Sequence, residues 1–108
     1  MDNTETEKQK VISLLQFARK AGKLEKGFDA TVRTCKRRSA RLVMIASDLA
    51  ENSRKRVLRL TEESGVPVYE FLSKKEMSVL FDRQEIGILS VNDVNFANGL
   101  KKYLRSVQ

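Results

Sequence analysis

The chain has 108 residues, 41% of them hydrophobic, which suits one domain with a modest core. It carries 21 Lys and Arg against 14 Asp and Glu, contains no His, and has a single Cys. The lack of His removes the commonest general base and metal ligand, and one Cys forms neither an internal disulfide nor a thiolate metal site. We therefore expect no enzymatic activity, no cofactor and no metal in a single domain over 1–108, with an ordered core over about 8–105.

The positive charge is unevenly distributed along the chain. Residues 1–60 carry 15 Lys+Arg and 7 Asp+Glu, a net charge of +8, whereas residues 61–108 carry 6 and 7, a net charge of −1. Such a basic region is typical of phosphate binding, because cations that neutralise phosphates release condensed counterions. A basic protein can also bind a membrane surface, but no expected helix sets a Lys/Arg face against a broad Phe/Leu face. Nucleic acid is therefore the favoured partner, and no membrane contact is expected.

The apolar runs and the first residues bear on location. The longest apolar runs, such as residues 42–46, are far shorter than the roughly 20 residues that cross a bilayer. Residues 1–7 are acidic and polar, unlike a secretory signal, and the single Cys35 suits a reducing compartment. We expect a cytoplasmic protein, and its small size and polar surface favour a monomer.

Helical and strand patterns alternate along the chain. In chain order, the first predicted elements are a helix over 8–21, a short extended link at 24–25, a helix over 27–37 and a buried strand over 41–47. A helix from about 48 to Gly65, a strand over 66–71 and a short helix over 73–80 follow. The last elements are a polar loop over 82–85, a strand over 86–91, and a helix from 92 or 93 that carries Leu104 on its apolar stripe. Residues 1–5 and 106–108 are expected to be frayed.

Several boundaries rest on capping signals. Asp48 with Glu51, and Ser73 with Glu76, match the capping-box pattern, and residue 92 or 93 is expected to cap the last helix. Strands separated by helices of this length predict an α/β fold. The expected architecture is a three-layer α-β-α sandwich with a small mixed central sheet.

The segment "GKLEKGFDATVRTCKRR", residues 22–38, is the strongest functional candidate. Gly27 stands where the free N–H groups of a helix start attract anions, and Asp29 can accept hydrogen bonds from base amino groups. The cations around this start are Lys23, Lys26, Arg33, Lys36 and Arg37. A simpler interpretation stays open, in which Gly27 or Asp29 only caps the helix and the cations are solvated.

Other charged or reactive residues have simpler interpretations. The basic run over 54–56 is typical of a solvated helix face, although it could extend an RNA footprint. Asp48 is expected to cap a helix, and Cys35 is expected to be a small core residue because no His is present to activate it. The chain contains no Gly-rich phosphate loop.

Four motifs between Val11 and Leu104 carry a resemblance to a known family: "ARKAGKL", "LVMIASD", "VPVYEFLSKKEM" and "VNDVNFANGLKKYL". In this order they resemble the bacterial YlxQ-type members of the L7Ae ribosomal protein family, which bind kink-turn RNA. The resemblance implies an α-β-α sandwich. It also implies an RNA site built from the start of the second helix and from the loop before the last predicted strand.

The resemblance also assigns site residues. The family's second helix opens Gly-x-Asn-Glu, and the matching residues here are Gly27, Phe28, Asp29 and Ala30, with Arg33 at a family Lys position. Asp29 thus lacks the amide donor of Asn, and Ala30 replaces the Glu that reads guanine edges. In the loop, about 82–88, residues Ile86, Gly87 and Ile88 match the family's apolar cover over a splayed-out base, whereas Asp82 and Glu85 add negative charge.

We therefore expect non-catalytic binding of structured, kink-turn-like RNA, with ribosomal RNA as a candidate partner. The expected RNA-binding residues are Lys23, Lys26, Gly27, Phe28, Asp29, Ala30, Arg33, Lys36, Arg37, Ile86, Gly87 and Ile88. The alternative is a protein-interaction module on the same fold, with only weak nonspecific RNA binding, because fold does not fix function. Binding at physiological salt separates the two.

Overall fold

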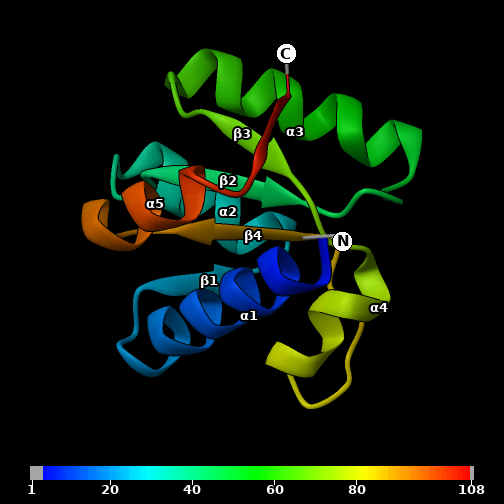
Figure 1. Cartoon of the computed structure of the whole chain (residues 1–108). Helices are drawn as coiled ribbons and strands as arrows, with labels where there is room; N and C mark the ends of the chain where they lie inside the picture. Colours follow the sequence, from blue (N-terminus) through cyan, green and yellow to red (C-terminus); the bar gives the residue numbers. More distant parts are fainter. Residues whose placement is uncertain (1–3, 108) are drawn as a thin grey trace.

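Five strands form one mixed sheet that lies between two helical layers in the computed structural model, which describes residues 4–107 (Figure 1). The helices are α1 (Thr4–Lys20), α2 (Phe28–Lys36), α3 (Glu51–Ser64), α4 (Lys74–Met77) with the 3-10 turn η1 (Ser78–Leu80), and α5 (Val94–Lys101). The strands are β1 (Leu24–Lys26), β2 (Leu42–Ile45), β3 (Val68–Glu70), β4 (Ile88–Val91) and β5 (Arg105–Val107). Their order is β1-β4-β2-β3-β5, and only β2 and β3 are parallel.

The central strands are buried on both faces, as their branched, non-alternating sequence predicts. Along β2, Leu42 and Met44 join one core cluster with α1, α4 and α5, whereas Val43 and Ile45 join a second cluster with α2 and α3. Figure 1 shows α1 and α5 in front of the strands and α2 behind them. The predicted three-layer α-β-α sandwich is therefore confirmed.

Three backbone hydrogen bonds gather loops at one end of the sheet. The Ser47 amide donates to the Leu72 carbonyl (2.8 Å), and the Ala46 amide donates to the Gly87 carbonyl (2.9 Å). The Gly27 amide donates to the Ile88 carbonyl (2.8 Å). The starts of α2, α3 and α4 and the loop before β4 therefore lie at the carboxyl end of the parallel strands, where α/β sheets commonly bind ligands.

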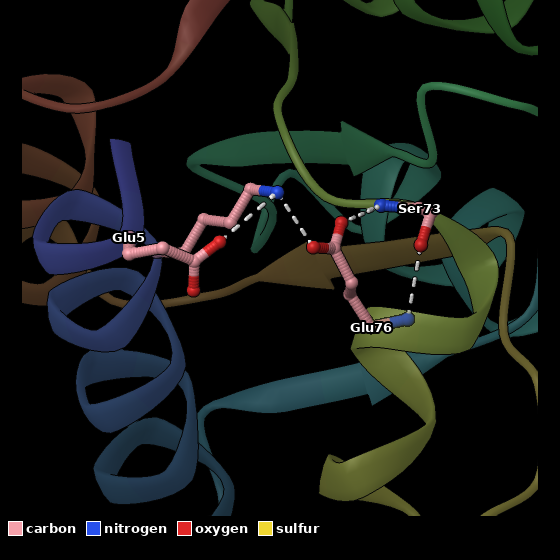
Figure 2. Close-up of polar contacts among 4 residues, drawn as sticks. Glu5, Ser73 and Glu76 are labelled. Atoms are coloured by element: carbon pink, nitrogen blue, oxygen red, sulfur yellow. Dashed lines mark hydrogen bonds and ion pairs between the residues drawn. The ribbon is translucent and has the colours of Figure 1, made fainter. Parts of the chain in front are cut away.

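Two predicted caps are confirmed. The Ser73 hydroxyl accepts from the Glu76 amide (3.1 Å), while the Glu76 carboxylate accepts from the Ser73 amide (2.9 Å), which completes a capping box (Figure 2). The same carboxylate forms an ion pair with Lys8 of α1 (2.7 Å), so it ties α1 to α4. At α5, the Asp93 carboxylate accepts from the amides of residues 95 and 96.

The predicted Asp48–Glu51 capping box is wrong. The residue before α3 is Ala50, which provides no side-chain cap. Asp48 instead accepts a hydrogen bond from the Lys74 amide (2.9 Å), so it caps α4, which begins 26 residues later in the chain. The physical reason is that the loop after β2 passes beside the start of α4 at the carboxyl end of the parallel strands.

The two ends of the chain also differ from prediction. The first helix already includes Thr4 and ends at Lys20, and the last helix ends at Lys101, so Leu104 lies outside it. Residues 105–107 form β5 along β3 and are not frayed, because backbone pairing with β3 orders them. Regular structure thus extends beyond the expected 8–105 core at both ends. Residues 1–3 and 108, also predicted to fray, lie outside the described residues.

Candidate nucleic-acid interface

The start of α2 is built around Gly27. This residue has φ 91° and ψ 163°, a backbone conformation that favours glycine. Its carbonyl accepts from the Thr31 amide (3.1 Å) and from the Thr31 hydroxyl (2.8 Å). No side chain caps the helix, so the N–H groups of its first turn can receive an anion.

One face of α2 is buried, and the opposite face carries charge. Ala30, Thr31, Thr34 and Cys35 are buried against the sheet and α3. The exposed residues, at helical spacing, are Asp29, Arg33, Lys36 and Arg37. The predicted cations of α2 therefore share one solvent-facing stripe.

The predicted cations near α2 form no ion pair with the carboxylates of the described residues. Over residues 4–107, the ion pairs within 4.0 Å join Lys8 to Glu5 and Glu76, and Arg54 to Glu70. Five cations are predicted to contact RNA: two around β1, two on α2, and Arg37 directly after α2. Within that part of the chain, none of them has a carboxylate at that distance. Their charge is therefore available to an external anion, and phosphate is the anion that such patches most often bind.

Lys26 links the two halves of the predicted site. This residue ends β1, and its Nζ donates to Gln84 Oε1 (3.0 Å) in the loop before β4. The same Nζ lies 5.2 Å from the centre of the Phe81 ring, which the Arg19 guanidinium also approaches, at 5.3 Å. These contacts, with the Gly27–Ile88 hydrogen bond, bring the start of α2 beside the loop over 82–88.

The apolar side chains of this loop do not form an exposed surface on which a base could stack. Ile86 and Ile88 are buried, one in each core cluster, so both side chains belong to the interior. Gly87 packs closely against Leu49, in the loop between β2 and α3, because a Cβ at position 87 would lie 2.7 Å from Leu49 Cδ1. Their contact with a base stays a prediction. The exposed part of the loop is residues 82–85, which carry the negative charges noted from sequence.

Two contacts at this end of the sheet were not predicted from sequence. The Arg56 guanidinium of α3 lies 4.0 Å from the centre of the Phe28 ring, and Gln84 holds Lys26. The partners are 28 and 58 residues apart, so no periodicity connects them. The only sequence signal was the basic run over 54–56, within which Arg54 pairs with Glu70 (3.1 Å).

Three further features of the described residues concern metal binding, the single Cys and membrane spanning. No group of three or more His, Cys, Asp or Glu side chains gathers within residues 4–107 in a way that could hold a metal ion. Cys35 is buried, as predicted, and burial raises the pKa of its thiol while a hydrogen bond with Ser64 opposes the shift. No helix in the described part of the chain is long and apolar enough to cross a membrane.

The fold and this surface define a class of protein: a three-layer α-β-α sandwich that presents an uncapped helix start and a basic stripe beside a neighbouring loop. Comparison with known proteins gives the family. The model described as "Ribosomal protein L7Ae/L30e/S12e/Gadd45 family" matches residues 9–101, so the chain belongs to that family.

Two individual proteins are also similar to this chain. The chain is 28% identical over 100 residues to a curated protein of Enterococcus faecium named "RNA-binding protein YlxQ", and the match covers 93% of this chain and 96% of that protein. A solved structure of a protein with unknown function from Bacillus halodurans has a TM-score of 0.81 and 23% identity, covering 87% of this chain and 95% of that chain. The structural similarity shows that the fold is shared.

Proposed function

We propose that this protein binds structured RNA through the start of α2 and the adjacent loop, without catalysis. The observation that carries the proposal is the stripe of cations on α2 that have no carboxylate within 4.0 Å among residues 4–107, next to a helix start that no side chain caps. A phosphate backbone satisfies both features at once, because it supplies negative charge and accepts hydrogen bonds from amides. Family membership and the RNA-binding name of the relative from E. faecium support the same function.

The residues divide into phosphate contacts and base contacts. Gly27 and the amides that follow it bind phosphate, and five cations position the backbone: Lys23, Lys26, Arg33, Lys36 and Arg37. Asp29 accepts from base amino groups, while Phe28, Ala30 and the loop over 86–88 shape the surface around the base. The preferred target is kink-turn-like RNA associated with the ribosome. The protein acts as a cytoplasmic monomer.

A salt titration tests this function. Binding is measured for a kink-turn RNA and for a plain duplex of equal length, across a range of salt concentrations. Tighter binding of the kink-turn RNA that persists at physiological salt supports structured-RNA recognition. Equal and steeply salt-sensitive binding of both RNAs contradicts it, because backbone charge alone would then account for the affinity.

Matched lysine variants locate the interface. Lys36 and Lys101 are both exposed and each is the last residue of its helix, α2 or α5. Lys36→Ala is expected to weaken binding to all RNAs and to lower the salt slope by about one. Lys101→Ala removes the same charge from α5, which covers the opposite face of the sheet from α2, and is expected to leave the slope unchanged. Equal effects of the two variants would contradict the assigned surface.

A further inference from the structure

Helices α2 and α3 run side by side in the same direction. Phe28 at the start of α2 contacts Arg56 near the start of α3. Each helix also joins two strands that run in the same direction, α2 between β1 and β2 and α3 between β2 and β3. Both helices therefore begin at the same end of the sheet. The first turns of α3 are thus part of the surface around Gly27, although the sequence places them more than 20 residues away.

Arg56 is held in place by an aromatic ring. Its guanidinium carbon lies 4.0 Å from the centre of the Phe28 ring, and that ring is half-buried against the core cluster of α2 and α3. Stacking of a guanidinium on a ring leaves its N–H groups free at the edge, where they can donate to an anion. The stack also restricts the long Arg side chain before any ligand arrives.

The charge of Arg56 is not paired with any carboxylate of the described residues. Arg54, two residues earlier, lies 3.1 Å from the Glu70 carboxylate, and that pair fixes α3 to β3. Arg56 has no carboxylate within 4.0 Å among residues 4–107. The two arginines of the basic run therefore differ. Arg54 stabilises the packing of α3 against β3, whereas the guanidinium of Arg56 is available to an external anion.

A second ring-held cation lies on the other side of Gly27. Lys26 rests on Phe81, which belongs to the core cluster of α1, α4 and α5, whereas Phe28 belongs to the cluster of α2 and α3. The two cations thus approach the α2 start from opposite faces of the sheet. Lys26 was predicted from sequence as a phosphate contact, and Arg56 is its counterpart on the α3 side.

We infer that Arg56, stacked on Phe28, is a further phosphate contact, and that the RNA footprint crosses from α2 onto α3. This inference rests on the proposed function. It adds that the RNA presents phosphates on both sides of the α2 start, which a folded backbone does and a short extended strand does not. Because the ring restricts Arg56 before binding, less conformational freedom is lost when a phosphate binds to it.

Four variants test the role of Arg56. Binding of each to the kink-turn RNA is measured across salt concentrations, after circular dichroism has confirmed folding. Arg56→Ala is expected to weaken binding about threefold or more at physiological salt and to lower the salt slope by about one. Arg59→Ala removes the same charge from an exposed position on the same helix and is expected to change affinity less than about twofold.

The other two variants separate charge from stacking. Arg56→Lys keeps the charge and is expected to keep the slope but lose part of the affinity, because an ammonium does not stack as a guanidinium does. Phe28→Leu keeps an apolar side chain and Arg56 itself, so it is expected to lower affinity with the slope retained.

The outcomes distinguish this inference from the proposed function. If Lys36→Ala lowers affinity and slope while Arg56→Ala behaves like Arg59→Ala, the α3 contact is overturned and the function stands. If the unmodified protein binds neither RNA, both fall. If Phe28→Leu weakens binding but Arg56→Ala does not, Phe28 contacts the RNA itself and the role given to Arg56 is wrong.

Discussion

The hydroxyl pair that fixes α2 to the sheet allows a quantitative prediction. Thr34 of α2 and Ser90 of β4 are 3% and 0% exposed, and Thr34 Oγ1 and Ser90 Oγ form a hydrogen bond at 3.0 Å. The Thr34 hydroxyl gives its one hydrogen to the Thr31 carbonyl (3.0 Å), so within the hydroxyl pair Ser90 donates and Thr34 accepts. Ser90 Oγ has no other hydrogen-bond partner within the described residues, and its burial makes it sensitive to the loss of Thr34.

The two single substitutions should therefore differ in cost. Ser90→Ala is expected to lower the free energy of unfolding by about 0.5–1.5 kcal/mol, because Thr34 keeps its bond to the Thr31 carbonyl. Thr34→Val is expected to cost about 1–3 kcal/mol, because it leaves the Ser90 hydroxyl buried and unpaired. The double variant should cost less than the sum, because it removes both polar groups together.

Urea unfolding of the four proteins, with a shared m-value, measures these free energies. The reasoning is refuted if the double variant equals the sum of the single variants within about 0.3 kcal/mol, the range found for independent sites. It is also refuted if Thr34→Val costs no more than Ser90→Ala. At temperatures where all four proteins are folded, RNA affinity should be nearly unchanged, because neither hydroxyl reaches the surface.

Three further predictions concern individual groups. Asp48→Ala should lower the free energy of unfolding by about 1 kcal/mol through loss of the α4 cap, whereas Glu51→Gln should change it by less than about 0.5 kcal/mol; equal losses in urea unfolding would contradict the assigned cap. The hydrogen bond from Lys8, then that from the capped backbone, lowers the pKa of Glu76. Its carboxylate therefore stabilises the fold above the ordinary Glu pKa, and this contribution is lost as pH falls through the lowered pKa. Urea midpoints from about pH 7 to about pH 3 should fall less steeply for Glu76→Gln, and parallel curves would refute this. Because burial raises the pKa of Cys35, its thiol should react with a thiol reagent much more slowly in the folded protein than in urea, and equal rates would exclude this burial.

Most of the secondary structure could be predicted because its signals are local. The Ser73–Glu76 capping box and the Asp93 cap each lie within a few residues of the amides they bind, so sequence spacing is enough to find them. The central strand β2 was found in the same way, because a short run of branched residues without alternation is typical of a strand covered on both faces.

The features that were missed depend on contacts between distant segments. Asp48 has the sequence pattern of a cap for α3, but its carboxylate reaches α4 because the loops after β2 and β3 meet at one end of the sheet. Residues 105–107 have no strong strand pattern, and they are ordered by pairing with β3. The Phe28–Arg56 stack likewise requires α2 and α3 to be packed in parallel, which no local pattern encodes.

Asp29 and Ala30, which stand where the family has Asn and Glu, bear on how the proposed interface discriminates among RNAs. Ala30 is only 7% exposed and has no polar side-chain atom, so it cannot read a base edge. Asp29 is exposed, and its carboxylate favours the positive end of the helix, yet it also repels phosphate. In the proposed interface, the cations that offset this repulsion, including Lys26 and Arg56, contact the RNA backbone, which carries no base identity. On the proposed interface, discrimination therefore comes mainly from the path of the RNA backbone, with Asp29 as a base contact. Exchange of base pairs that Asp29 does not contact, when it preserves that path, should have little effect on affinity.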